Sequence, residues 1–390
     1  MLRGRSSLPF LTRSAMRYPI SNASLDNDGD IAILGRKGSG KTYTAKGLVE
    51  RLIKRGRRVI VIDPMSIWWG LRIDADGTSP GLPVVVIGGA NGDIPLPSHA
   101  PEAGAHVAKV LLASNVSAVI DVADMRRPSN LLFVAALLRE LYENHRGEAI
   151  WIVLEEADIW APQTGRSAED QVVFAEVEIL ARRGRSRGFR LVSITQRPAR
   201  IHKDVLSQLS TMAVLALPGL HDRKAVAAWM EGVTEDASEV FNTLPTLATG
   251  EGWVWTPQQK RLIRERFPSI TTFDSSSTPV AGQRRVPQSA LSPETLEALR
   301  QAFAALAGNP STAPRKTRLR GVSPTAAGAA IRRLRESRNI SQEDLAKLIG
   351  SEQKSISRME SGRTFVSTRI LERIADKTGC ELRVAFVPKT

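Results

Sequence analysis

The octet Gly35-Arg36-Lys37-Gly38-Ser39-Gly40-Lys41-Thr42 fits the pattern G-x-x-x-x-G-K-[ST], a glycine-rich turn followed by a lysine and a hydroxyl. The glycines let successive backbone N–H groups point at one anion, and a following helix adds the favourable end of its dipole. Lys41 would reach the outer phosphates of a nucleoside triphosphate, and the Thr42 hydroxyl would be a ligand of Mg²⁺. The octet therefore predicts binding of Mg²⁺ and ATP.

The flanks of the octet favour this interpretation over a glycine turn beside a surface lysine. The apolar run 31–34 precedes the octet and is typical of a strand. Residues 43–54 follow it and place their apolar side chains at helical spacing. A phosphate-binding loop requires this order of strand, loop and helix.

Two adjacent carboxylates follow another apolar run. Residues 150–154 predict a buried strand, and Glu155 and Glu156 come directly after it. In a Walker B element the first carboxylate serves Mg²⁺ and the second activates the attacking water, so we assign Glu155 to the metal and Glu156 to the water. The usual first residue is Asp, and Glu155 is one methylene longer. Acidic residues are also common where a strand simply meets solvent, and the upstream P-loop is what favours the catalytic interpretation.

A glutamine and a group of arginines flank a further apolar run, residues 191–195. Gln196 follows the run directly, where it would contact the γ-phosphate and the attacking water. Arg182 and Arg185 precede the run, and arginines there could reach a nucleotide across a subunit boundary as arginine fingers. The same arginines suit a basic surface that faces solvent or DNA equally well.

The elements that must position these residues are those of an α/β domain. Up to about residue 272, short β-branched runs alternate with helical patterns, as in a parallel sheet buried on both faces. Ligands of such doubly wound sheets bind beyond the carboxyl ends of the strands. Runs 252–255 and 262–264 predict a small antiparallel extension. The remaining strand candidates are 59–63, 84–87, 118–121, 150–154, 191–195 and 212–217.

The order of these motifs resembles the HerA branch of the HerA/FtsK superfamily over roughly residues 25–275. That resemblance implies a RecA-like P-loop ATPase that forms a homo-oligomeric ring, usually a hexamer, and moves double-stranded DNA through its pore. It also implies that Arg182 and Arg185 serve the subunit interface, and it raises a nuclease or a mobile-element protein as a further partner. The matching segments are the P-loop, 61–64, 154–157, 182–188, 193–198, 206–208, 222–224 and 273–275.

Residues 323–390 predict a separate all-α domain. Their helical patterns, interrupted by a turn at Gly350, resemble a helix-turn-helix of the Cro/phage-repressor class. In that geometry the third helix, residues 352–359, would enter the major groove of DNA. The alternative is a helical bundle used for protein contact, and a short strand is expected over 381–387. The outward-facing, DNA-binding candidates on the third helix are Gln353, Lys354, Ser357 and Arg358.

Composition agrees with a polyanionic partner. The net charge is +14, and residues 315–390 carry 17 Lys and Arg against 8 Asp and Glu. We expect an ATPase domain over 1–275, a Pro/Ser/Ala-rich linker over 276–322 with one helix from residue 293 to 306, and the helix-turn-helix domain over 323–390. The single cysteine, Cys380, fits a reducing cytoplasm, and no apolar run is long enough to predict a membrane span.

Two functions fit these observations. The one we favour is an ATP-dependent double-stranded DNA translocase or helicase-type motor that its helix-turn-helix targets to DNA. The alternative is an ATP-gated, sequence-specific DNA-binding regulator without translocation. A non-catalytic scaffold is disfavoured because Lys41, Thr42 and Glu156 are all present.

Overall fold

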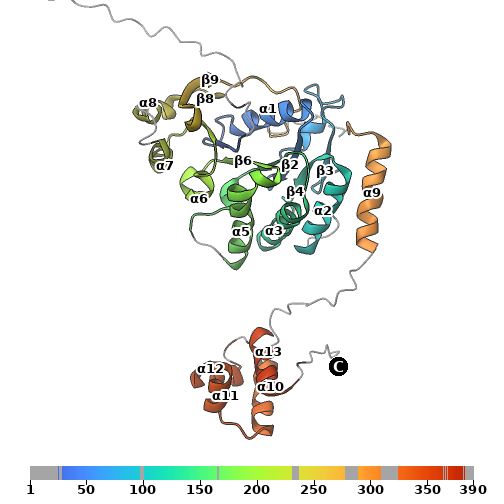
Figure 1. The fold of residues 1–390 in the computed structure, drawn as a ribbon, viewed down its shortest axis with the longest axis vertical. Coiled ribbons are helices and arrows are strands. Elements are labelled where there is room, and N and C mark those ends of the chain that lie inside the picture. The colour runs from blue at the N-terminus through green and yellow to red at the C-terminus, as the bar shows by residue number, and fades with distance from the viewer. Residues whose placement is uncertain are drawn as a thin grey trace, which may run out of the picture. The chain divides into compact units, whose positions relative to one another are not determined.

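The computed structural model describes residues 25, 29–96, 101–164, 167–230, 237–276, 289–308, 324–362, 364, 366, 368–380 and 382. The chain divides into two compact units, residues 1–310 and 311–390, and each is described by itself (Figure 1). Most of the expected linker, its boundary at Ser323 and all but residue 382 of the expected strand over 381–387 lie outside the described residues. The domain limits inferred from the sequence therefore stay predictions.

A sheet of nine strands in the order β3-β4-β2-β5-β6-β1-β7-β8-β9 forms the centre of the first unit, as far as its residues are described. From β3 to β7 neighbouring strands pair in parallel, whereas β7 with β8 and β8 with β9 pair antiparallel. The predicted α/β class, its mostly parallel sheet and its antiparallel extension are confirmed. The strands are β1 (Ile31–Leu34), β2 (Arg58–Asp63), β3 (Val84–Ile87), β4 (Ser117–Asp121), β5 (Ile150–Leu154), β6 (Phe189–Thr195), β7 (Thr211–Leu215), β8 (Glu251–Thr256) and β9 (Arg261–Arg266).

Helices cover both faces of this sheet because its strands are apolar on both sides (Figure 1). Ile31 and Ile33 of β1 pack in the cluster that contains α1, and the alternate residues Ala32 and Leu34 pack in the cluster that contains α2, α3 and α5. The helices are α1 (Lys41–Lys54), α2 (Pro101–Ser114), α3 (Arg127–Asn144), α4 (Ala157–Trp160), α5 (Ala168–Arg183), α6 (Lys203–Leu206), α7 (Leu220–Met230) and α8 (Ala237–Thr243).

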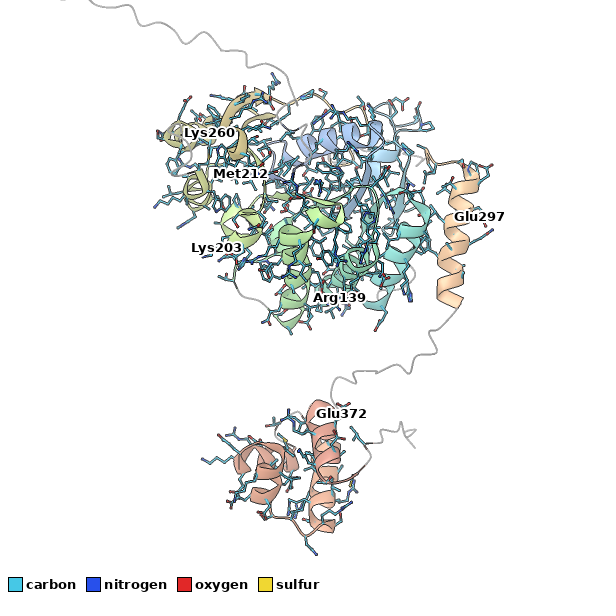
Figure 2. All side chains as sticks on the ribbon, in the orientation of Figure 1. Arg139, Lys203, Met212, Lys260, Glu297 and Glu372 are labelled. Carbon is cyan, nitrogen blue, oxygen red and sulfur yellow. The ribbon has the colours of Figure 1, made fainter. Side chains whose placement is uncertain are left out.

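The helix expected within the linker forms as α9 (Pro293–Gly308) and belongs to the first unit. Its Leu299 and Phe303 are buried in the same core as α2. Glu297 lies exposed on the outer side of the helix (Figure 2). The helix therefore adds to the core of the α/β domain.

An extended segment after β9, residues 267–276, is here named the strap because it runs over α1. The buried carboxylate of Glu50 accepts hydrogen bonds from the backbone N–H groups and hydroxyls of Thr271 and Thr272. The fully buried Lys46 ammonium forms an ion pair with Asp274 at 3.1 Å. The strap thereby completes the burial of the helix that follows the P-loop.

The second unit is a small helical bundle. In neither unit is any described helix long and apolar enough to cross a membrane. Ser341 caps one helix by accepting from Asp344 N–H at 3.1 Å, and Gly350 ends it with φ +64°. The predicted all-α domain is confirmed. Its helices are α10 (Pro324–Ser337), α11 (Gln342–Ile349), α12 (Gln353–Glu360) and α13 (Thr368–Lys377).

Close packing of α2 on α3 gives a first testable prediction. A Cβ atom added at Gly104 would lie 2.0 Å from the carbonyl oxygen of Phe133. Gly104→Ala should therefore destabilise the protein by about 1–3 kcal/mol, although helix propensity alone would favour alanine by roughly 1 kcal/mol. The measurement is the midpoint of urea unfolding. Ala113→Ser, at an exposed position of the same helix, is the control and should shift the midpoint little.

Candidate functional site

The P-loop is hydrogen-bonded to the backbone at the carboxyl ends of two strands, β6 and β7. Gly35 N–H donates to Thr195 O at 3.3 Å, and Arg36 N–H donates to Ala216 O at 2.9 Å. The loop then turns through two left-handed residues, Gly38 at φ +78° and Gly40 at φ +94°. Side chains rarely adopt this conformation, so the glycines permit a concave run of backbone N–H groups at the start of α1.

A turn before β8 presses against the outer side of this loop. Gly250 N–H donates to Ser39 O at 3.0 Å, and the Thr249 hydroxyl donates to Gly38 O at 3.4 Å. A Cβ atom at Gly40 would lie 3.3 Å from Gly250 N. The antiparallel extension of the sheet is thus in direct contact with the P-loop.

Glu155 lies buried beside the P-loop. Its carboxylate accepts a hydrogen bond from the Thr42 hydroxyl at 3.1 Å and another from the Trp68 indole N–H at 3.0 Å. Burial, together with the charges of the nearby Asp63 and Glu156, raises the pKa of Glu155 to about 7, and the charge of Lys41 opposes that shift. The Thr42 and Glu155 oxygens are adjacent hard donors, the kind that Mg²⁺ prefers, and a cation there would favour the ionised carboxylate. The residues therefore fit the expected metal.

Glu156 occupies a left-handed backbone conformation, φ 47° and ψ 57°, which is uncommon outside glycine. Its carboxylate accepts from the Gln196 side-chain amide at 3.1 Å and lies 3.8 Å from the Lys41 ammonium. Burial raises the pKa of Glu156, and the charge of Lys41 opposes that shift. The structure thus brings together Lys41, Glu156 and Gln196, which the sequence places in three separate segments.

Asp63, at the end of β2, positions the indole that contacts Glu155. Its buried carboxylate accepts from the N–H groups of Met65, Ile67 and Trp68 at 2.9, 2.8 and 2.8 Å. Burial, together with the charge of Asp121, raises the pKa of Asp63 to about 6. The turn after β2 is thereby fixed with Trp68 directed at Glu155, a contact that the sequence did not indicate.

Several of the predicted site residues line one cleft of about 940 Å³ at the carboxyl edge of the sheet. Lys41, Thr42, Glu155, Glu156 and Gln196 all line it, as the order of motifs predicts. Sequence reasoning missed the contribution of the β8–β9 extension and the strap. The available signals were the repeated glycines at 250 and 252 and the family-matching segment 273–275, which lies in the strap. The missed lining residues include Thr249, Gly250, Arg266, Phe267, Pro268 and Ser269.

The arginines expected at a subunit boundary lie away from this cleft in their own chain. Arg182 forms ion pairs with Glu178 at 3.1 Å and with Asp204 at 3.4 Å. Arg182 and the exposed Arg185 both precede β6, whereas Gln196 follows it, so they lie at the opposite edge of the sheet. Any action on a nucleotide would therefore be on that of another subunit, and this role stays a prediction.

On the second unit, α12 presents the side chains proposed to read DNA. Gln353, Lys354, Ser357 and Arg358 are exposed, and Ile356 and Met359 are buried in the bundle. The end of α12 is fixed by Glu360, whose carboxylate accepts from the Arg335 guanidinium at 2.7 Å and from the Gln342 amide at 2.8 Å. One face of α12 is thus held against the bundle, and its polar face is open.

Comparisons with known proteins match both units. Residues 24–66 match the family model "Helicase HerA, central domain", and residues 326–384 match the model "Helix-turn-helix domain". Over 102 residues the chain is 32% identical to the DNA double-strand break repair helicase HerA of Pyrococcus furiosus. That alignment spans 26% of this chain and 17% of the relative.

Solved structures are similar at low identity. VirB4 of Thermoanaerobacter pseudethanolicus has a TM-score of 0.46 and 15% identity, over 62% of this chain and 89% of that one. The genome packaging NTPase B204 from Sulfolobus turreted icosahedral virus 2 has a TM-score of 0.40 and 12% identity, over 62% of this chain and 98% of that one.

The family matches agree with the resemblance that the motifs indicated. The P-loop with β1, α1 and the whole of β2 falls within the HerA match, and α11 and α12 fall within the helix-turn-helix match. The chain thus carries a P-loop segment similar to part of the central domain of HerA and a C-terminal segment that matches the helix-turn-helix model.

Proposed function

We propose that the protein is an ATP-dependent motor that moves double-stranded DNA and that its helix-turn-helix domain targets it to DNA. The observation that carries the proposal is the meeting of five side chains in one cleft: Lys41, Thr42, Glu155, Glu156 and Gln196. Together they supply the cation, the metal ligands, the base and the polar sensor that hydrolysis of a nucleoside triphosphate requires. The similarity to a DNA repair helicase supports DNA as the polymer on which the energy is used.

In this proposal Thr42 and Glu155 would hold Mg²⁺, and the backbone of residues 35–42 with Lys41 would hold the phosphates. When bound, the metal would supply charge neutralisation at the outer phosphates. Glu156 accepts the proton of the attacking water, and its raised pKa makes it a better base than an exposed carboxylate. Gln196, which donates a hydrogen bond to Glu156 at 3.1 Å, orients that water.

Two further features belong to the proposal. A ring of subunits, usually six in the resembling family, would bring Arg182 or Arg185 of one subunit to the nucleotide of the next. The exposed polar face of α12 would bind the major groove, with Gln353 and Arg358 at base edges and Lys354 on phosphate. The same face also supports the alternative, an ATP-gated regulator that binds one DNA sequence and does not move.

Substitutions at Lys41 and Glu156 should separate binding from turnover. Lys41→Ala removes a cation from the phosphate site and should lower ATP affinity at least tenfold in equilibrium titration. Glu156→Gln keeps the shape of the side chain and removes the base, so it should bind ATP normally and lose at least 100-fold in steady-state turnover. The exposed Glu143→Gln is the control and should behave as wild type. Full activity of Glu156→Gln would refute the assignment of the base.

The raised pKa of Glu155 predicts a stability effect that depends on pH. Because the folded state holds this proton up to about pH 7, ionisation of Glu155 destabilises the nucleotide-free protein as pH rises from about 4.5 through 7. Glu155→Gln cannot ionise. Its stability relative to wild type, measured as the difference in the free energy of unfolding, should therefore be greater at pH 8 than at pH 5. The amide oxygen of Glu155→Gln can still accept from the Trp68 indole N–H at both pH values, so the comparison isolates the charge.

The measurement is urea unfolding at the two pH values without Mg²⁺, with Glu143→Gln as the matched control. A difference between Glu155→Gln and wild type that is the same at pH 5 and pH 8 would show that Glu155 is ionised throughout this range. In the presence of Mg²⁺ and ATP, Glu155→Gln should also lose turnover.

Motor and regulator differ in their response to DNA length. A motor that tracks along DNA spends more ATP on longer duplexes, so steady-state hydrolysis should rise from no DNA to short and then to long random-sequence duplexes. The same series with Glu156→Gln measures the background. A low rate that is indifferent to duplex length, with tight binding to one sequence gated by ATP, would instead establish the regulator.

A further inference from the structure

The cleft has two sides, and the strand order assigns them. Glu155 and Glu156 follow β5 and Gln196 follows β6, on one side of β1 and its P-loop. The turn at Thr249 and Gly250 precedes β8, on the other side of β1. A water activated at Glu156 must attack the terminal phosphate, so this phosphate lies on the β5–β6 side. The other end of a bound nucleotide must then leave the P-loop away from β5 and β6.

The turn at Gly250 and the first residues of the strap form a wall of the cleft at that other end. The turn at Gly250 touches the P-loop through the bond from Gly250 N–H to Ser39 O, and Phe267 N–H donates to Gly250 O at 2.8 Å. The strap is tied to α1 where the Tyr43 hydroxyl accepts from Ile270 N–H at 3.2 Å. Tyr43, Gly250 and the first residues of the strap all line the cleft. These anchors hold the wall in place without a ligand.

Arg266 brings a cation to this wall. It is the last residue of β9, it is exposed, and it lines the cleft. Its cross-strand partner on β8 is Glu251, which directly follows the turn that contacts the P-loop. A planar guanidinium can stack on a purine face and donate to ribose or base acceptors, which suits it to a nucleoside.

We propose that Tyr43, Gly250, Arg266, Pro268 and Ser269 form the subsite for the nucleoside half of the nucleotide, with Arg266 as its principal polar contact. This inference rests on the proposed function, because it assumes that a nucleoside triphosphate binds at the P-loop. It gives the β8–β9 extension and the strap a function in substrate recognition. It also separates two cations in one cleft, since Lys41 serves the phosphates and Arg266 serves the nucleoside.

The test compares two ligands that share their phosphates, MgATP and magnesium tripolyphosphate, by calorimetric titration of the full chain. Arg266→Ala should weaken MgATP at least tenfold and leave tripolyphosphate within twofold of wild type. Lys41→Ala should weaken both ligands. Arg261→Ala removes an exposed arginine from the other end of the same strand and should change neither affinity. Arg266→Lys keeps the charge but loses the planar group, so it should restore little of the MgATP affinity.

Each other outcome contradicts the inference in a distinct way. Equal losses for both ligands in Arg266→Ala would assign Arg266 to the phosphates. If Arg266→Ala bound MgATP as tightly as wild type, Arg266 would not belong to the site. The proposed function would still stand in that case, because wild type binds MgATP. If wild type bound neither ligand, the nucleotide site itself, and this inference with it, would be wrong. Unfolding midpoints of the variants confirm that each is folded.

Discussion

Several carboxyl groups are buried together at the carboxyl edge of the sheet, and burying their charge is energetically unfavourable. Asp63, Asp121, Glu155 and Glu156 are all buried there, and two buried ammonium groups, Lys41 and Lys46, offset part of their charge. Burial raises the pKa of each of the four carboxyls, and a neighbouring carboxylate adds to the shift in every case, Asp124 for Asp121 and Asp158 for Glu156. A site with this excess of buried acid is stabilised by an added cation. The fold therefore holds, before any ligand arrives, the field that a magnesium–nucleotide complex would complete.

Local features of the sequence predicted much of this edge. A parallel sheet brings the ends of its strands together, so motifs after three apolar runs had to meet once the runs were recognised as parallel strands. The contact between Glu156 and Gln196 follows from that rule. The buried and exposed faces of α12 likewise follow from helical spacing, with Ile356 inward and Arg358 outward.

The remainder of the site depends on contacts between distant segments. Lys46 meets Asp274, although the two residues are 228 residues apart in the sequence. Spacing within a segment contains no information about such a pair. Trp68 illustrates the limit, because an apolar pair of tryptophans is expected in a core and Trp68 is indeed fully buried. Only the fold shows that its one polar atom is directed at Glu155.

Trp68 and Trp160 also make the site observable by light. The indole of Trp68 donates to the Glu155 carboxylate, and the indole of Trp160 donates to the backbone oxygen of the same residue at 2.9 Å. The emission energy of an indole depends on the electric field along its ring. A change in the charge near Glu155 therefore alters the emission of two native fluorophores, and the chain carries its own optical reporter of what occupies the cleft.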